Sequence, residues 1–249
     1  MLALHPGVHI FDAPRTFYLD IGGLRVAFAG FPYSRKNVRS EFPRLVEELA
    51  PADSPADARL LCVHHCFEGA QVGVHNYTFR TGSDVVRAND VPGRFDVVLT
   101  GHVHRYQVLS HDLTGRVLDS PIIYSGSIER TAFAEREETK GFVIVNLYCD
   151  RATENVKVSW EFRELPTRTM VVRDLDLSGV GPSVLERRVR ELLSRLPRDA
   201  VVQLRVRGKP RNETRVVMGA ENMRKLAPPT MNLDLVFVDG ERPTRRGRG

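Results

Sequence analysis

The chain has 249 residues, with 36 Lys and Arg against 31 Asp and Glu, so its formal net charge is +5. Its hydrophobic content of 42% and charged content of 27% are ordinary for a globular protein and argue against a disordered chain. No apolar stretch reaches the roughly 20 residues of a transmembrane helix, so we expect no membrane association. The three cysteines are too few for a disulfide framework and predict a cytoplasmic location.

Charge and histidine are unevenly distributed along the chain. Residues 1–150 have a formal charge of −3 and contain all eight histidines, whereas residues 151–249 have a charge of +8. The last nine residues, 241–249, carry four arginines. This division predicts a histidine-bearing domain over 1–150, a basic domain over 151–240 and a basic tail over 241–249.

The first 150 residues predict an α/β domain. Short apolar or alternating runs indicate strands, and an amphipathic pattern interrupted by Pro43 indicates one helix at 37–49. The expected strands are, in chain order, 7–11, 16–21, 24–30, 60–63, 95–100, 106–111, 122–124 and 141–147. Residues 68–93 have four glycines and little periodicity, which predicts a long loop.

The remaining chain predicts a small α+β domain. A strand at 169–177 precedes a helix that begins at Pro182 and ends before Pro197, with its apolar residues at helical spacing. Residues 200–207 alternate between apolar and polar side chains, which is typical of a strand with one buried face. A short helix at 221–225 and a strand at 233–238 complete this domain.

Histidines directly follow two of the buried strands. His64 and His65 come after the run 60–63, and Gly101-His102-Val103-His104 comes after the run 95–100. Ligands bind at the carboxyl ends of the strands in an open α/β sheet, so these imidazoles should meet at one edge. Because neutral imidazole is a common metal ligand, the pattern predicts a metal site. A Cys-x-His-His-Cys zinc site is disfavoured, since strand alternation separates Cys62 from at least one histidine.

The Gly-His-x-His turn, about 40 residues after His-His, resembles the last two motifs of the calcineurin-like metallophosphoesterases. Residues 124–133, Tyr-Ser-Gly-Ser-Ile-Glu-Arg-Thr-Ala-Phe, and the later Lys140-Gly141 resemble a segment of SbcD-type DNA repair exonucleases, with Ser125 in place of the usual proline. The resemblance is specific over about 60–147. It implies a metallophosphoesterase α/β sandwich followed by a small α+β capping domain.

The resemblance also implies the metal ligands. His64 and His102 would bind one of two divalent ions, Mn²⁺ or Mg²⁺, and His104 would bind the other. His65 would lie outside the direct ligands. The first three family motifs, Asp-x-His, Gly-Asp-x-x-Asp and Gly-Asn-His-Asp/Glu, are absent from the sequence. These motifs carry the carboxylates and the leaving-group acid, so we expect the chain to be the C-terminal portion of such an enzyme.

Further residues are candidates for binding the substrate. By resemblance and position, four would contact it: His75, Arg105, Tyr124 and Ser127. The predicted helix after Pro182 presents four arginines that could bind DNA phosphates: Arg187, Arg188, Arg190 and Arg195. For His75 a solvated loop position, and for the arginines a solvated helix face, remain open alternatives.

The resemblance therefore implies a metal-dependent phosphodiester hydrolase, a DNA exonuclease in repair. DNA would be its substrate, an SMC-like ATPase a partner, and a homodimer its assembly. Two alternatives remain: a phosphodiesterase for small substrates, and a non-catalytic fragment that binds DNA or a partner. The histidines alone do not separate these functions.

Overall fold

The computed structural model describes the whole chain except residues 1–4, 6, 48, 150–155, 209–211 and 239–249. The predicted basic tail therefore lies outside the described residues. The chain divides into two compact units, the first comprising residues 1–129 and 138–166 and the second residues 130–137 and 167–249. Among the described helices, none has both the length and the apolar character needed to cross a bilayer.

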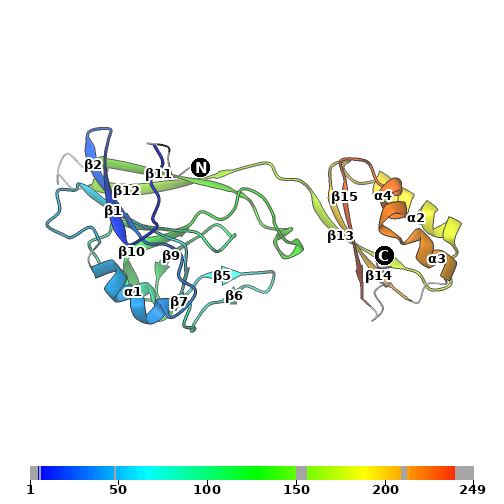
Figure 1. The fold of residues 1–249 in the computed structure, drawn as a ribbon, viewed down its shortest axis with the longest axis horizontal. Helices are drawn as coiled ribbons and strands as arrows, with labels where there is room; N and C mark the ends of the chain where they lie inside the picture. The colour runs from blue at the N-terminus through cyan, green and yellow to red at the C-terminus, as the bar shows by residue number, and fades with distance from the viewer. Residues whose placement is uncertain (1–4, 6, 48, 150–155, 209–211, 239–249) are drawn as a thin grey trace. The chain divides into compact units, whose positions relative to one another are not determined.

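A six-stranded sheet in the order β1-β2-β3-β8-β10-β9 forms the centre of the first unit (Figure 1). Its strands are β1 (Arg15–Ile21), β2 (Leu24–Gly30), β3 (Ala58–Val63), β8 (Val97–Thr100), β9 (Gln107–His111) and β10 (Val117–Tyr124). The four inner strands run parallel, while the edge strands β1 and β9 are antiparallel to their neighbours. The predicted strands that map onto this sheet are confirmed. Residues 7–11, also predicted as a strand, are not one.

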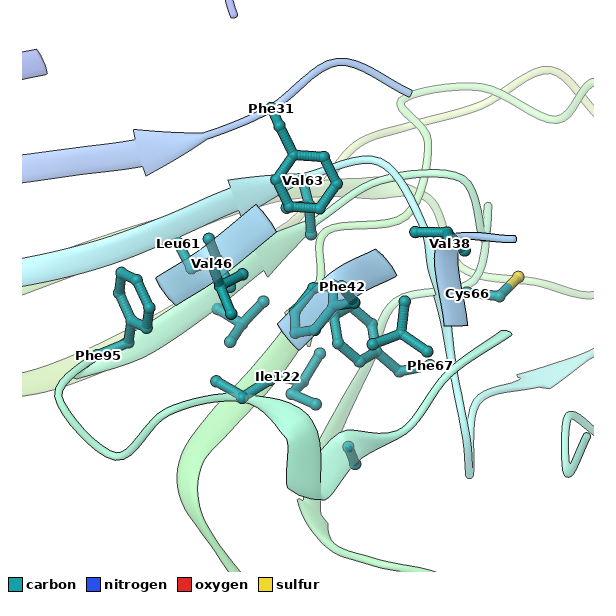
Figure 2. Packing of buried hydrophobic residues seen from close by; sticks show 14 of the residues in the cluster. Phe31, Val38, Phe42, Val46, Leu61, Val63, Cys66, Phe67, Phe95 and Ile122 are labelled. Carbon is teal, nitrogen blue, oxygen red and sulfur yellow. The ribbon is translucent and has the colours of Figure 1, made fainter. Parts of the chain in front are cut away.

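One face of this sheet is covered by the helix α1 (Val38–Glu47), which confirms the helix predicted at 37–49. Its residues Val38, Phe42 and Val46 are buried at helical spacing and belong to the same apolar cluster as Phe67 and Ile122 (Figure 2). Short elements fill the long loop: β4 (Cys66–Phe67), β5 (Gln71–Val72), β6 (Tyr77–Thr78), β7 (Val85–Val86) and η2 (Ala88–Asp90).

The other face of the sheet is covered by a separate antiparallel pair, β11 (Gly141–Cys149) and β12 (Val156–Glu164). Val143 and Trp160 of this pair pack against an apolar cluster that includes Leu60 and Val97. The opposite face of β11 exposes three large apolar side chains: Phe142, Ile144 and Tyr148. Among the described strands, β11 pairs only with β12, so one of its edges has no partner there.

The unit boundary differs from the one expected near residue 150. The structure divides the chain near residue 166, because β12 pairs with β11 over its whole length and belongs to the first unit. The sequence analysis did not predict β12. Its alternating Val156, Val158 and Trp160, which face the sheet core, were the available signal.

The second unit is a three-stranded parallel sheet in the order β13-β14-β15. Its elements are β13 (Met170–Asp176), α2 (Pro182–Ser194), β14 (Val201–Arg207), α3 (Asn212–Val217), α4 (Ala220–Leu226) and β15 (Asn232–Phe237); residues 130–137 add η3 (Phe133–Glu135). The helix α2 contributes Leu185, Val189 and Leu193 to a core shared with Val202 and Leu204. The strands and two of the helices were predicted, whereas α3 was not. Because helices connect parallel strands, this unit is of the βαβ kind rather than α+β.

Candidate functional site

The predicted meeting of the histidines at one sheet edge is confirmed for His64 and His102. Strands β3 and β8 are parallel neighbours with Val63 paired to Thr100, so both chains leave the sheet side by side. The backbone N–H of Gly101 donates to the carbonyl of Val63 at 3.2 Å, which extends this pairing by one residue. As a result the rings of His64 and His102 lie with their centroids 5.4 Å apart, edge to face.

The space around Gly101 and the backbone conformation of His102 are the notable features of this turn. A Cβ at Gly101 would lie 2.5 Å from Nδ1 of His64, so only glycine leaves room for that imidazole. His102 has φ of 73°, a left-handed conformation that a residue with a side chain adopts at a cost. Strained backbone of this kind is concentrated at functional sites.

His65 is enclosed by the protein, in contrast to the exposed His64. Its side chain is 1% exposed. Thr100 Oγ1 accepts from the backbone N–H of His65, and the Tyr124 hydroxyl donates to the carbonyl of His65 at 3.2 Å. Burial, together with the charges of His102 and His64, lowers the pKa of His65 to about 4. His65 is therefore a neutral packing residue beneath His64 at neutral pH.

Tyr33 contacts three of the imidazoles and was missed by the sequence analysis. Its ring centroid lies 5.7 Å from His64, 5.2 Å from His65 and 5.5 Å from His102, with the last two rings stacked on it. Tyr33 follows β2, the parallel neighbour of β3. An aromatic residue just after a third parallel strand was the available signal, but only the strand order shows which histidines it meets.

The turn that carries His104 is anchored by a buried lysine. Lys140 Nζ donates to the carbonyl of His104 at 2.8 Å and lies 3.0 Å from a carboxylate oxygen of Glu138. The Lys140 side chain is fully buried, whereas the His104 side chain is exposed. The backbone N–H of Ser127 also donates to the carbonyl of His104. The Lys-Gly segment thus stabilises the Gly-His-x-His turn from within the protein.

Neighbouring groups shift the pKa of the exposed His102 in opposite directions. Burial and the charge of His64 lower the pKa of His102, with a smaller contribution from His104. Asp84, in the long loop, acts in the opposite direction. Within the part of the chain that the structure describes, no group of three or more His, Cys, Asp or Glu side chains is arranged to hold a metal ion. The site therefore offers imidazole donors but not a complete set of metal ligands.

The four predicted substrate-binding residues do not form one cluster. Arg105 binds Asn76, the carbonyl of Gly73 and Glu138, so its guanidinium fastens the turn between β5 and β6. His75 is exposed in that turn. Tyr124 is fully buried, and its hydroxyl also accepts from the backbone N–H of Phe67. Ser127 donates its hydroxyl proton to the carbonyl of Glu129.

The four predicted DNA-binding arginines all lie on α2 or directly after it. Arg187 is 4.0 Å from a carboxylate oxygen of Glu191, one turn further along the helix. Arg188 and Arg195 line a groove, whereas Arg190 does not. All four side chains are exposed, so they remain available to an anionic ligand.

Comparison with known proteins does not identify a family for this chain. No family model matches it, and a comparison with curated proteins finds no match. The mixed α/β architecture and the paired histidines are therefore the findings on which a function must be argued.

Proposed function

We propose that this chain forms the histidine-bearing part of a metal-dependent phosphodiester hydrolase of the calcineurin-like metallophosphoesterase type, acting on DNA as an exonuclease. The observation that carries the proposal is the contact between His64 and His102 at the ends of two neighbouring parallel strands, with ring centroids 5.4 Å apart. By the family resemblance these two would bind one Mn²⁺ or Mg²⁺ ion, and His104 of the same turn would bind a second.

The donor set of the described residues does not by itself fit two such ions. Mn²⁺ and Mg²⁺ favour oxygen ligands, and the described part of the chain brings no carboxylate group together with these histidines into a metal-binding cluster. We therefore propose that the carboxylate ligands come from a polypeptide segment outside the described residues. The leaving-group acid of the resemblance would come from the same segment.

The charge distribution supports a nucleic-acid substrate over a small phosphodiester. Residues 151–249 have a formal charge of +8, against −3 for residues 1–150. A strongly basic part of a chain attracts the phosphate backbone through counterion release. The incomplete donor set favours a second candidate, a non-catalytic module that binds DNA without cleaving it.

Calorimetric titration with Mn²⁺ tests the ligand assignment. We expect weak binding by the chain alone, because two imidazoles without a carboxylate provide little charge for a hard cation. His64→Ala and His102→Ala should each abolish this binding. His75→Ala, a change at an exposed histidine in another turn, should leave it intact. Two tight Mn²⁺ sites, or binding unchanged by His64→Ala, would contradict the assignment.

A complementation experiment tests the reaction. A segment that carries the three absent family motifs, fused upstream of residue 1, should give Mn²⁺-dependent hydrolysis of a labelled DNA strand. The same fusion with His64→Ala should be inactive, and the fusion with His111→Ala, a change at an exposed histidine at the end of β9, should remain active. A fused chain that binds Mn²⁺ and DNA but hydrolyses neither DNA nor a small phosphodiester would refute the hydrolase and support the binding module.

A further inference from the structure

A groove in the second unit brings three arginine side chains together. Its volume is about 430 Å³, and it is lined by residues of β13, α2 and the two positions after α2. The lining residues are Arg173, Arg188, Glu191, Leu192, Arg195 and Leu196. This volume lies within the roughly 300–1,000 Å³ that is typical of small-molecule sites.

Local geometry explains why these arginines converge. Arg188, Leu192 and Arg195 are spaced four and three residues apart, so they follow one face of the helix. Arg173 lies two residues from the buried Leu175, on the face of β13 that supports the helices, and it is paired in register with Leu204. The helix and the strand therefore both contribute arginines to the lining, and the Arg173 guanidinium also donates to the carbonyl of Val172 at 3.0 Å.

The charge of the groove is positive and suits a phosphate group. Three arginines and Glu191 give the lining a formal charge of +2, and outside the lining Arg188 also acts on Asp176, whose pKa is lowered by hydrogen bonds and, to a smaller extent, by Arg188. An arginine guanidinium stays protonated in proteins. Arg187, which is outside the lining, partly compensates Glu191. A phosphomonoester carries about −1.5 to −2 at neutral pH, whereas a backbone phosphodiester carries a single charge.

The apolar part of the lining indicates what the phosphate is attached to. Leu192 and Leu196 offer aliphatic surface beside the arginines, and guanidinium planes stack on aromatic rings while they bind phosphate oxygens in pairs. We propose that this groove binds a nucleotide through its terminal phosphate, either as a free mononucleotide or as the phosphorylated end of a strand. This inference goes beyond the proposed hydrolase, since it concerns a second site in the other unit and requires no metal.

Calorimetric titration of the full chain in the presence of a chelator tests the site without any contribution from metal-dependent hydrolysis. Deoxyadenosine monophosphate should bind, and Arg188→Gln should weaken its binding about tenfold or more, because a charge-assisted hydrogen bond is lost. The matched control is Arg198→Gln, an exposed arginine after the same helix that does not line the groove. Its effect should stay below about twofold.

Four further ligands show which chemical groups the groove recognises. Deoxyadenosine and inorganic phosphate should each bind far more weakly than the nucleotide, since each lacks half of the recognised group. Of two oligonucleotides that differ only in a 5′-phosphate, the phosphorylated one should bind more tightly if strand ends occupy the groove. A mononucleotide that binds more tightly than either oligonucleotide assigns the groove to free nucleotides.

The inference is overturned by any of three results. These are no heat of binding with the nucleotide, equal losses in Arg188→Gln and Arg198→Gln, or inorganic phosphate that binds as tightly as the nucleotide. Because Arg188 is exposed, its substitution should leave the fold intact, and circular dichroism verifies this.

Discussion

The two units are both built on parallel strands, yet they place their reactive side chains differently. In the first unit, side chains at the carboxyl ends of β2, β3 and β8 meet, and Tyr33, His64 and His102 form a cluster there. In the second unit, the proposed nucleotide site lies between the edge strand β13 and the helix α2, where arginines line a groove. A parallel sheet thus provides a scaffold for a site, while the residues after each strand decide whether its edge becomes one.

The largest difference between the units should be in the stability that is lost when a lysine is replaced. Lys140 is buried against Glu138 and the His104 carbonyl in the first unit. Lys140→Met should lower the free energy of unfolding by about 3 kcal/mol, because it breaks a buried ion pair and leaves the half-buried His104 carbonyl with one donor fewer, while Arg105 still pairs with Glu138. Lys225 pairs with Glu221 on the surface of α4, and Lys225→Met should have almost no effect. Urea unfolding of the two variants tests this contrast, and equal losses would contradict it.

The separate cores of the units predict separate unfolding. Leu204 is completely buried in the core of the second unit. Leu204→Ala should destabilise that unit by about 3 kcal/mol, since it removes buried methyl groups and leaves a cavity. Leu61→Ala is the matched change in the first unit, where Leu61 is equally buried. In a calorimetric scan each variant should shift only one of two transitions; a single transition shifted by both would show that the units unfold together.

Much of this organisation could be predicted from the sequence. The runs before His64 and Gly101 are short and apolar, and the rule that strand ends meet at one edge correctly placed His64 beside His102. The Tyr33 contact could not be predicted in the same way, since it requires β2 to lie next to β3. The buried state of Tyr124 could not be predicted either, because a tyrosine at the end of a strand can face either the solvent or the core.

Other differences between the prediction and the structure also have identifiable causes. Residues 7–11 have strand-like composition, but in the described structure β1 pairs only with β2 and leaves these residues outside the sheet. Four arginines of one helix were predicted to bind DNA. Only Arg188 and Arg195 of these line the groove, together with Arg173 of β13, a residue that no pattern within the helix could indicate.

Removing the buried hydroxyl of Tyr124 should have a smaller effect on stability, and that effect should depend on pH. Tyr124→Phe should cost about 2 kcal/mol at neutral pH, because the buried N–H of Phe67 loses its acceptor. Burial raises the pKa of Tyr124. Above about pH 10 the unfolded chain releases the phenol proton while the folded chain keeps it, so folding loses stability as the pH rises.

The difference in stability between the wild type and Tyr124→Phe should therefore shrink between about pH 10 and 11. Taking this difference cancels the contribution of the cysteines, which titrate over the same range. Urea unfolding at several pH values provides the measurement, and a difference that stays constant would show that the phenol does not contribute.

The smallest effect concerns backbone strain at His102. His102→Gly and His102→Ala both remove the imidazole, but only alanine retains the cost of a left-handed backbone at φ of 73°. The glycine variant should be more stable than the alanine variant by about 1 kcal/mol. In the second unit, Gly179 has φ of 69° and open space around it, so Gly179→Ala should cost a similar amount. An alanine variant at 102 as stable as the glycine variant would show that this turn is unstrained.

The exposed face of β11 has a consequence for how the protein behaves when it is heated. Residues 141–149 read Gly-Phe-Val-Ile-Val-Asn-Leu-Tyr-Cys, without a charge or a proline, and one edge of this strand has no partner among the described strands. Short, uncharged segments of high β-propensity are those that self-associate into cross-β assemblies. Once β12 detaches, both edges of β11 are free to pair with other chains. Unfolding by heat should therefore be irreversible, with a rate that depends on protein concentration.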